Sequence, residues 1–284
     1  MTISTVGILG SGIMGSGIAE VAAKSGHDVI LRSRQQATAD AMLTALEKSL
    51  AKQVERNKIE QSTADEVRSR VSATDDLAAI AGADLVLESV VEDLDIKREL
   101  FAAVDAIVGD HAIIATNTST LPVVDLAVAT GRPDKVVGIH FFNPAPAMSL
   151  VEIVRPLTAS DETVAAARAF AEACGKSPVE VKDRAGFIVN ALLFPYLNNA
   201  VRMLENGTAS AEDIDTAMKG GCNFPMGPLA LLDLVGLDTS LAILATLSEE
   251  FKDPNYAAVP VLRRLVAAGQ LGRKSGAGFY DYSR

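Results

Sequence analysis

The amino-terminal part of the chain alternates short apolar runs with longer stretches in which apolar residues recur at helical spacing. Short apolar runs bounded by turn residues predict buried strands, and the stretches between them predict the helices of βαβ units. The predicted strands are Val6–Leu9, Asp28–Arg32, Leu85–Leu87, Ala112–Ala115, Val136–His140 and Leu150–Val154. The predicted helices are Ile13–Ser25, Gln35–Gln53 and Lys97–Ile107. We therefore expect an α/β fold with a Rossmann-type, doubly wound sheet.

Beyond about Asp183 the apolar residues recur at helical spacing only. Because no β-rich run returns except the tail GFYDY, this part of the chain predicts a helical domain. The predicted helices are Gly186–Glu205, Ser210–Lys219, Gly227–Phe251 and Val259–Ala268. We expect a dinucleotide-type α/β domain over residues 1–184 and an all-helical C-terminal domain over residues 185–284, joined near Lys182–Ala185.

Length and charge narrow the classes of protein to consider. At 284 residues the chain exceeds the usual size of one compact core, and its net charge of −10 argues against binding nucleic acid or an anionic membrane through bulk charge. The apolar stretch Pro228–Leu247 is interrupted by Asp233 and Asp238, so it is not expected to span a membrane. Cys174 and Cys222 give neither a disulfide framework nor a metal-ligand spacing. With no basic leader at the start, these features predict a soluble cytoplasmic protein without a metal site.

A glycine-rich turn connects the first predicted strand to the first predicted helix. It reads Gly10-Ser-Gly12-Ile13-Met14-Gly15. Gly10 permits a tight turn, Gly12 lets the backbone approach a pyrophosphate, and Gly15 lets the helix pack closely on the strand. The helix N-terminus then offers N–H groups and a partial positive charge to the phosphates. We expect a dinucleotide at this turn, because a turn that only packs would leave the spacing unexplained.

The end of the second predicted strand bears on which dinucleotide binds. About 20 residues beyond the glycine pattern, an acidic residue would hold the ribose 2′-hydroxyl of NAD. The chain instead has Arg32, Ser33 and Arg34, with no carboxylate at Ser33. Arginine binds a phosphate through a charged fork and cannot take the acidic role. We therefore predict NADP as the cofactor, with NAD as the alternative if the two arginines are simply solvated at a helix start.

A histidine and a carboxylate stand in two neighbouring apolar runs. His140 ends the run that begins at Val136, and Glu152 lies twelve residues later, inside the next run. Two strands joined by a Pro-containing turn would bring the pair within hydrogen-bond reach. A buried carboxylate on one imidazole nitrogen fixes the tautomer and leaves the other nitrogen to move a proton. The pattern predicts a proton-transfer site.

Motifs along the whole chain resemble those of the L-3-hydroxyacyl-CoA dehydrogenases. They occur in one order from the first strand to the last few residues, and the shorter bacterial 3-hydroxybutyryl-CoA dehydrogenases are the most similar members. The motifs are Thr116-Asn-Thr-Ser119-Thr, Gly138-Ile-His140-Phe-Phe-Asn143-Pro, Glu152, Gly186-Phe-Ile-Val-Asn190, Asn223-Phe-Pro-Met-Gly-Pro and Leu271-Gly-Arg-Lys-Ser-Gly-Ala-Gly-Phe-Tyr. The resemblance implies a Rossmann domain followed by a helical domain through which the enzyme forms a homodimer.

The resemblance also implies catalytic roles for four residues. His140 would accept the proton of the substrate's 3-hydroxyl while hydride leaves C3 for the nicotinamide, and Glu152 would orient the histidine. Ser119 would bind the substrate oxygen, and Asn190, from the second domain, would contact the acyl oxygens. A lone histidine at a strand end is more often structural, but the matching positions of the other three residues favour a catalytic set.

Two further groups of residues follow from the resemblance. The first group would lie near the ribose and nicotinamide of the cofactor, and it comprises Glu92, Lys97, Asn117 and Asn143. The second group would bind the phosphates of coenzyme A, and it comprises Lys52, Arg56 and Lys58. A basic cluster in an acidic protein favours an anionic ligand, while a solvated helix face is the alternative.

Taken together, these features predict an NADP-dependent (S)-3-hydroxyacyl-CoA dehydrogenase that acts on short acyl chains such as 3-hydroxybutyryl-CoA and acetoacetyl-CoA. One rival is a dehydrogenase of a free hydroxy acid, as the L-gulonate and carnitine dehydrogenases are, and another is a dehydrogenase of acyl-carrier-protein thioesters. A crystallin-like, cofactor-binding protein without turnover is the rival from a different class. The complete set of Ser119, His140, Glu152 and Asn190 argues against that last reading.

Overall fold

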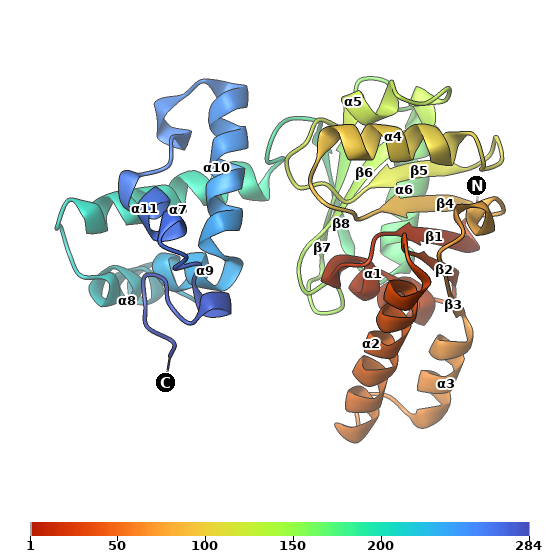
Figure 1. The fold of residues 1–284 in the computed structure, drawn as a ribbon, viewed down its shortest axis with the longest axis horizontal. Helices are drawn as coiled ribbons and strands as arrows, with labels where there is room; N and C mark the ends of the chain where they lie inside the picture. The colour runs from red at the N-terminus through yellow and green to blue at the C-terminus, as the bar shows by residue number, and fades with distance from the viewer. Residues whose placement is uncertain (1, 284) are drawn as a thin grey trace. The chain divides into compact units, whose positions relative to one another are not determined.

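The computed structural model describes residues 2–283, and the chain divides after Asp183 into two compact units. The predicted domain boundary, between residues 184 and 185, lies one residue further along the chain. The first unit is an α/β domain and the second is helical (Figure 1). The predicted fold class, a Rossmann-type sheet followed by an all-helical domain, is confirmed.

An eight-stranded sheet forms the centre of the first unit, in the order β3-β2-β1-β4-β5-β6-β7-β8. Strands β1 to β6 run parallel, β7 runs antiparallel to β6, and β8 runs parallel to β7. The strands are β1 (Thr5–Leu9), β2 (Asp28–Arg32), β3 (Val71–Thr74), β4 (Leu85–Glu88), β5 (Ile113–Thr116), β6 (Val136–Phe141), β7 (Leu150–Arg155) and β8 (Ser177–Lys182). The central strands are buried on both faces, as their continuous apolar runs predict.

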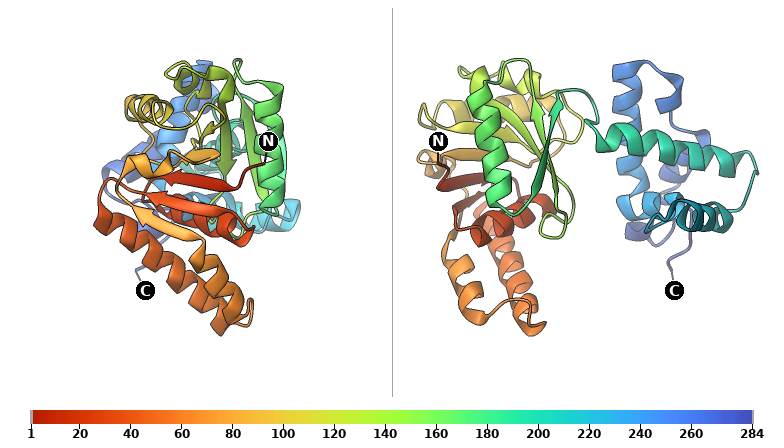
Figure 2. Two further views of the ribbon diagram at one scale, coloured as in Figure 1. Left: turned by 90° about the vertical axis from the view of Figure 1, so that its right-hand side faces the viewer. Right: turned by 180° about the vertical axis from the view of Figure 1, so that it is seen from behind.

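Helices cover both faces of this sheet. One layer contains α1 and α6, which share an apolar core with the sheet, and α4 and α5 lie on the opposite face (Figure 2). The helices α2 and α3 pack against each other and project from the edge near β3 (Figure 1). The helices of this unit are α1 (Ile13–Lys24), α2 (Gln36–Glu55), α3 (Gln61–Ser69), α4 (Leu94–Asp105), α5 (Val123–Ala127) and α6 (Asp161–Ala173).

The strand order places a ligand crevice beside the first strand. Strand β1 pairs with β2 on one side and with β4 on the other, so the chain crosses over at this point of the sheet. Where the order of a doubly wound sheet reverses, the loops at the carboxyl ends of the strands diverge and leave room for a ligand. The glycine-rich turn follows β1 at this edge.

The α-helices of the second unit, over residues 184–283, are α7 (Val189–Glu205), α8 (Ala211–Cys222), α9 (Pro228–Val235), α10 (Leu237–Phe251) and α11 (Pro260–Ala267). The prediction of one helix over Gly227–Phe251 is wrong. The chain breaks at Gly236, whose φ of 102° lies in the region that favours glycine, and α9 and α10 meet at 98°. No single helix within residues 2–283 is long and apolar enough to cross a membrane. Taken together, the bent pair α9 and α10 would be long and apolar enough, by length and composition only.

Two buried carboxylates accept backbone hydrogen bonds within the helical unit, and one of them accepts these bonds from the C-terminal tail. Asp215 accepts the backbone N–H groups of Leu229 and Ala230 at the start of α9, at 2.8 and 2.9 Å. Asp233 accepts the backbone N–H groups of residues 279 and 280, both at 2.9 Å. A Cβ on Gly278 would lie 2.0 Å from Oδ1 of Asp233, so this tail position requires glycine. The tail GFYDY forms no strand, and its Asp281 makes an isolated bridge with Ala277.

Candidate active site

The glycine-rich turn has the geometry of a phosphate-binding site. Gly10 has a φ of 129°, and a Cβ on it would lie 2.1 Å from the carbonyl oxygen of Ser89. A Cβ on Gly15 would lie 2.5 Å from the carbonyl oxygen of Gly10, so α1 packs closely on the turn. By contrast, apart from its chain neighbours, no described atom lies within 4 Å of a Cβ built on Gly12, the N-cap residue of α1, which has no side-chain cap. No side chain caps the first N–H groups of α1, and the uncapped start of a helix is suited to binding a phosphate.

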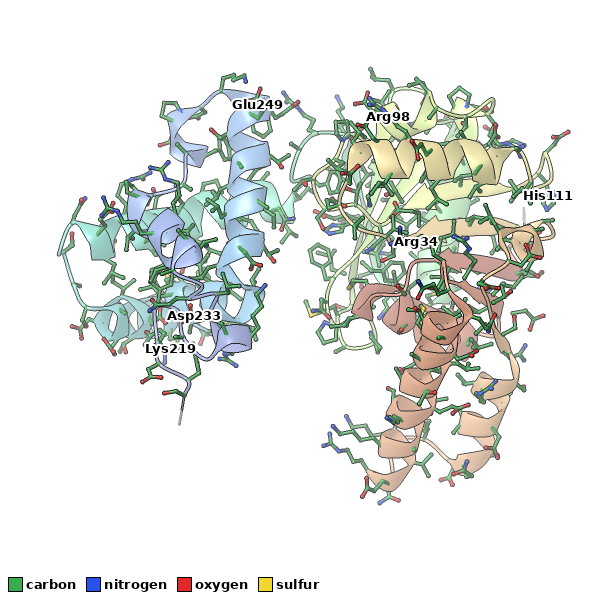
Figure 3. The ribbon with its side chains drawn as sticks, viewed as in Figure 1. Arg34, Arg98, His111, Lys219, Asp233 and Glu249 are labelled. Carbon is green, nitrogen blue, oxygen red and sulfur yellow. The ribbon has the colours of Figure 1, made fainter. Side chains whose placement is uncertain are left out.

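The arginine pair lies directly beside this turn. The backbone N–H of Gly10 donates to the carbonyl oxygen of Arg32 at 3.1 Å, which joins the turn to the end of β2. The guanidinium of Arg32 donates through Nε to the carbonyl oxygen of Asp75 at 3.2 Å. Ser33 is buried, and Arg34 is exposed at the turn between β2 and α2 (Figure 3). The segment thus offers two cations and no carboxylate where a ribose 2′-substituent would lie.

His140 and Glu152 form a buried hydrogen-bonded pair. They lie opposite each other in the antiparallel ladder of β6 and β7, and Nδ1 of His140 lies 2.7 Å from Oε2 of Glu152. A carboxylate accepts hydrogen bonds, so this contact suits the imidazole tautomer that has its proton on Nδ1. The Oγ atom of Ser119 lies 3.2 Å from Nε2 of His140. The predicted contact between histidine and carboxylate is confirmed, and the hydroxyl of Ser119 lies beside the other ring nitrogen.

An ion-pair network lies next to Ser119. Partial burial raises the pKa of the Glu92 carboxyl, but the Lys97 ammonium and hydrogen bonds from Thr118 and Ser119 outweigh it, so the pKa lies below its ordinary value. The ammonium of Lys97 is itself buried, 2.9 Å from Oε2 of Glu92 and 2.9 Å from Oε1 of Glu88. Lys97 therefore pairs with two carboxylates at once, and Glu92 is the exposed member of this network.

Sequence reasoning missed Glu88. The predicted strand ended at Leu87, one residue short of the observed end of β4, so the carboxylate was left outside it. The available signal was an acidic residue directly after an apolar run, at the edge where ligands bind in a doubly wound sheet.

The asparagines of the predicted set occupy different places. The side-chain oxygen of Asn117 accepts the backbone N–H of Phe141 at 2.8 Å, so Asn117 joins the ends of β5 and β6 beside His140. Asn143 lies in the turn after β6 and lines a groove. Asn190 belongs to the second unit, where it is the second residue of α7.

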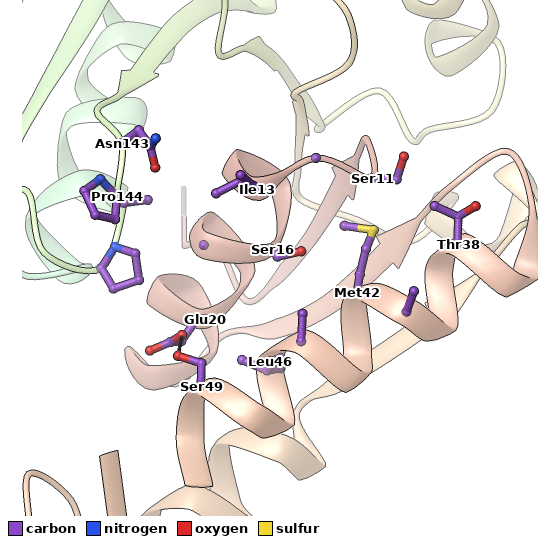
Figure 4. Close-up of a pocket in the computed structure, with 16 residues that line it drawn as sticks. Ser11, Ile13, Ser16, Glu20, Thr38, Met42, Leu46, Ser49, Asn143 and Pro144 are labelled. Carbon is purple, nitrogen blue, oxygen red and sulfur yellow. Dashed lines mark hydrogen bonds between the residues drawn. The ribbon is translucent and has the colours of Figure 1, made fainter. Parts of the chain in front are cut away.

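A groove of about 390 Å³ extends from the glycine-rich turn along α2. Its walls are α1, α2 and the turn at residues 143–146, and Glu20 and Ser49 meet at one end through a 2.7 Å hydrogen bond (Figure 4). Met42 and Leu46 give the floor an apolar character. The predicted basic cluster follows the last lining residue of α2, and it consists of Lys52, Arg56 and Lys58, all exposed. No carboxylate within residues 2–283 pairs with these three cations.

Comparison with known proteins identifies the family. Residues 5–184 match the NAD binding domain of 3-hydroxyacyl-CoA dehydrogenase, and residues 186–282 match its C-terminal domain. The chain belongs to the 3-hydroxyacyl-CoA dehydrogenase family. It is therefore an oxidoreductase whose first domain is of the NAD-binding type, and the resemblance stated from the motifs is confirmed.

Relatives within this 3-hydroxyacyl-CoA dehydrogenase family match over nearly the full length. A 3-hydroxybutyryl-CoA dehydrogenase of Clostridioides difficile is 46% identical, with 98% of this chain and 99% of the relative covered. The crystal structure of FadB2 from Mycobacterium tuberculosis superimposes with a TM-score of 0.97 at 46% identity, covering 99% of this chain and 100% of that one. The (S)-3-hydroxybutyryl-CoA dehydrogenase PaaH1 of Ralstonia eutropha gives a TM-score of 0.97 at 42% identity, with both chains covered completely.

Proposed function

We propose that the chain is a 3-hydroxybutyryl-CoA dehydrogenase that interconverts (S)-3-hydroxybutyryl-CoA and acetoacetyl-CoA with NADP(H). The observation that carries this proposal is the line of contacts from Ser119 through His140 to Glu152. Relatives that are 42–46% identical over nearly the whole chain bear the same activity in their names. A buried acid–base pair near the end of β6, at the same edge of the sheet as the glycine-rich turn after β1, suits the loss of a proton together with a hydride.

In the proposed mechanism, His140 is the group that moves the proton. With Nδ1–H donated to Glu152, Nε2 of the neutral imidazole has a lone pair that accepts the proton of the 3-hydroxyl. Glu152 then stabilises the imidazolium that forms, as a buried carboxylate does in other acid–base pairs. The hydroxyl of Ser119, which already contacts Nε2, would bind the substrate oxygen and aim it at this nitrogen.

The residues around the glycine-rich turn fit a dinucleotide. When bound there, the nicotinamide would supply the acceptor or donor of the hydride. Gly10, Gly12 and Gly15 would leave room for the pyrophosphate at the start of α1, and Arg32 and Arg34 would favour the 2′-phosphate of NADP over the free hydroxyl of NAD. Glu92 and Asn117, at the carboxyl ends of β4 and β5, would face the ribose and nicotinamide.

The groove along α2 supports coenzyme A as the carrier of the acyl group. Its apolar floor would take the pantetheine arm, and the cations Lys52, Arg56 and Lys58 stand where the arm would end in phosphates. Asn190 is assigned to the acyl oxygens by its match to the family motif. We also propose a cytoplasmic homodimer that forms through the helical unit. Within residues 184–283, six large apolar side chains are exposed, namely Ile188, Leu192, Met203, Phe224, Leu234 and Val235.

Initial rates with three substrates test the proposed function. The purified protein is mixed with NADPH or NADH and with acetoacetyl-CoA, free acetoacetate or acetoacetyl-acyl carrier protein, and cofactor oxidation is followed. We expect the highest kcat/KM with acetoacetyl-CoA and NADPH. A preference for the free acid or the carrier-bound thioester would assign the chain to one of those rival activities. Cofactor binding without turnover of any substrate would instead favour the non-catalytic reading.

A further inference from the structure

One buried carboxylate beside the candidate site has no role in the mechanism above. Glu88 is the last residue of β4, and its side chain has an exposed fraction of 0%. Acidic side chains are almost never fully buried unless they are paired. Removing one partner of such a pair is also costly. Because Glu88 lies at the carboxyl edge of the sheet, the groups that it holds lie close to the proposed chemistry.

Four hydrogen bonds converge on the two oxygens of Glu88. Its Oε1 atom accepts the backbone N–H of Val90 at 2.5 Å and Nζ of Lys97 at 2.9 Å. Its Oε2 atom accepts Nζ of Lys97 at 3.0 Å and Oγ1 of Thr116 at 2.7 Å. Each partner donates, so the position demands acceptors at both oxygens, which an ionised carboxylate supplies.

One set of contacts runs from Glu88 to Ser119 through the end of β5. The hydroxyl of Thr116 donates to Glu88 and accepts the backbone N–H of Thr118 at 3.1 Å. Thr118 is the residue before Ser119, so Glu88 sets the start of the loop that carries the serine. The position of the loop that carries Ser119 therefore depends on Glu88, which is buried and hydrogen-bonded at both oxygens.

A second set of contacts reaches the same serine through α4. Lys97, held by Glu88, lies 2.9 Å from Oε2 of Glu92. The other oxygen of Glu92 accepts the backbone N–H of Ser119 at 3.0 Å. The bond from Val90 to Glu88 fixes the loop on which Glu92 stands. Both routes therefore start at Glu88 and end at the backbone that carries the Ser119 hydroxyl.

We propose that Glu88 is a positioning residue that holds the Ser119 hydroxyl against Nε2 of His140 in the arrangement that proton transfer requires. The inference rests on the proposed function, because the place of Ser119 matters to turnover only if His140 exchanges a proton with the substrate. The side chain of Glu88 has an exposed fraction of 0%, so it does not reach the space that is open to substrate or cofactor. Its influence on the reaction passes through the two loops and through Ser119.

The variant Glu88→Gln tests this role with the smallest change of shape. The amide keeps the size of the side chain but replaces one acceptor oxygen by a donor, so at least one of the four hydrogen bonds to Glu88 is lost. We expect kcat for acetoacetyl-CoA reduction to fall roughly 10- to 100-fold, as when a reacting group is misplaced by about 1 Å. We expect KM for acetoacetyl-CoA to change by less than about threefold, because no group assigned to the thioester is altered.

A double-mutant cycle separates positioning from a general loss of stability. The kcat values of Glu88→Gln, Ser119→Ala and the double variant are measured at saturating substrate and cofactor. If Glu88 acts through Ser119, Glu88→Gln lowers kcat by less than about threefold once the serine hydroxyl is gone. Losses that multiply in the double variant would overturn the proposal, and so would an unchanged kcat in Glu88→Gln alone.

Asp105→Asn is the matched control. Asp105 is the last residue of α4, the helix that carries Lys97 near its start, and it pairs with Arg132 at 2.5 Å. We expect this variant to melt at a lower temperature and to keep kcat within about twofold of the unmodified protein. A loss of kcat equal to that of Glu88→Gln would mean that any broken ion pair on α4 has the same effect, which would overturn the assignment.

A second variant keeps the test decisive if Glu88→Gln does not fold. Thr116→Val removes only the hydroxyl that links Glu88 to the backbone of Thr118. We expect kcat to fall by roughly 3- to 10-fold, and the loss to disappear in the Ser119→Ala background. Additive losses would contradict the proposal. If the unmodified protein does not reduce acetoacetyl-CoA, the proposed function is wrong. If the unmodified protein is active but the losses in the double-mutant cycle are additive, only the role proposed for Glu88 is wrong.

Discussion

His140 and Glu152 face each other across β6 and β7, with Nδ1 of the histidine 2.7 Å from Oε2 of the glutamate. Both side chains are buried, with exposed fractions of 5% and 0%. The two strands run antiparallel, so the ladder itself sets the separation of the pair and no loop has to order to form it. The orientation of the imidazole is therefore built into the sheet, and Nε2 is left to face Ser119.

Glu152→Gln should retain the fold and lose most of the activity. An amide can still bond to Nδ1, but it cannot compensate the positive charge that forms on the histidine, and it can select the wrong tautomer. We expect kcat for acetoacetyl-CoA reduction to fall by about 10²- to 10⁴-fold. The control is Glu180→Gln on the exposed face of β8, which should leave kcat unchanged. Comparable rates for Glu152→Gln and its control would remove Glu152 from the mechanism.

Ser33→Asp should exchange the cofactor preference. A carboxylate at this position accepts hydrogen bonds from a ribose 2′-hydroxyl and repels a 2′-phosphate. We expect the ratio of kcat/KM for NADPH to that for NADH to fall by roughly ten- to several-hundred-fold, the effect of losing one or two charge-assisted hydrogen bonds.

Arg34→Ala is the matched variant for this cofactor test. The guanidinium of Arg34 is exposed beside Ser33, so its removal should weaken the binding of NADPH without strengthening the binding of NADH. If the unmodified protein already prefers NADH, the role given to Arg32 and Arg34 is wrong.

Replacing Lys52, Arg56 and Lys58 together by Ala should raise KM for acetoacetyl-CoA and leave kcat nearly unchanged. Exposed cations that bind distant phosphates contribute equally to the ground state and the transition state. We expect KM to rise by roughly 10-fold at low ionic strength and by less at 0.5 M salt, since such contacts are screened.

A truncated substrate provides the control for the basic cluster. Acetoacetyl-pantetheine lacks the nucleotide phosphates, so its KM should be the same for the triple variant and the unmodified protein. Lys182→Ala, at the exposed end of β8, should leave both values of KM unchanged. An equal rise in KM for the two substrates would show that the cluster does not bind the phosphates of coenzyme A.

The two cysteines should differ sharply in reactivity. Burial raises the pKa of the Cys174 thiol to about 11, whereas Cys222 is exposed. The thiolate is the reactive form, so at pH 8 roughly one Cys174 in a thousand is ionised. Brief treatment with iodoacetamide should therefore give one adduct, at Cys222, by peptide mass spectrometry. Modification of Cys174 at a similar rate would contradict the buried environment.

The central strands of the fold could be predicted because burial on both faces demands continuous apolar runs. Strands β3 and β8 were missed since they lie at the two edges of the sheet, where partly exposed positions dilute the apolar signal. The break at Gly236 was missed for a different reason. Apolar residues recur at helical spacing on both sides of it, and only the backbone conformation shows that one helix has become two.

Part of the candidate site could likewise be predicted from the sequence, and part could not. The pair of His140 and Glu152 could be predicted because two strands and a turn leave few registers for residues twelve positions apart. The network around Glu88 could not, because its partners come from three elements that meet only in the folded chain. Lys97 illustrates the limit most clearly: its match to the family placed it near the cofactor, while the structure buries its ammonium between two carboxylates.

The most direct test of the central claim is kcat for acetoacetyl-CoA reduction by His140→Gln at saturating NADPH. If His140 moves the proton, kcat should fall by roughly 10²- to 10⁴-fold, the usual share of general acid–base catalysis. Cofactor affinity, measured by titration of NADPH fluorescence, should stay close to that of the unmodified protein, because the glycine-rich turn is untouched. A variant that binds NADPH and turns over at a near-normal rate would contradict the account.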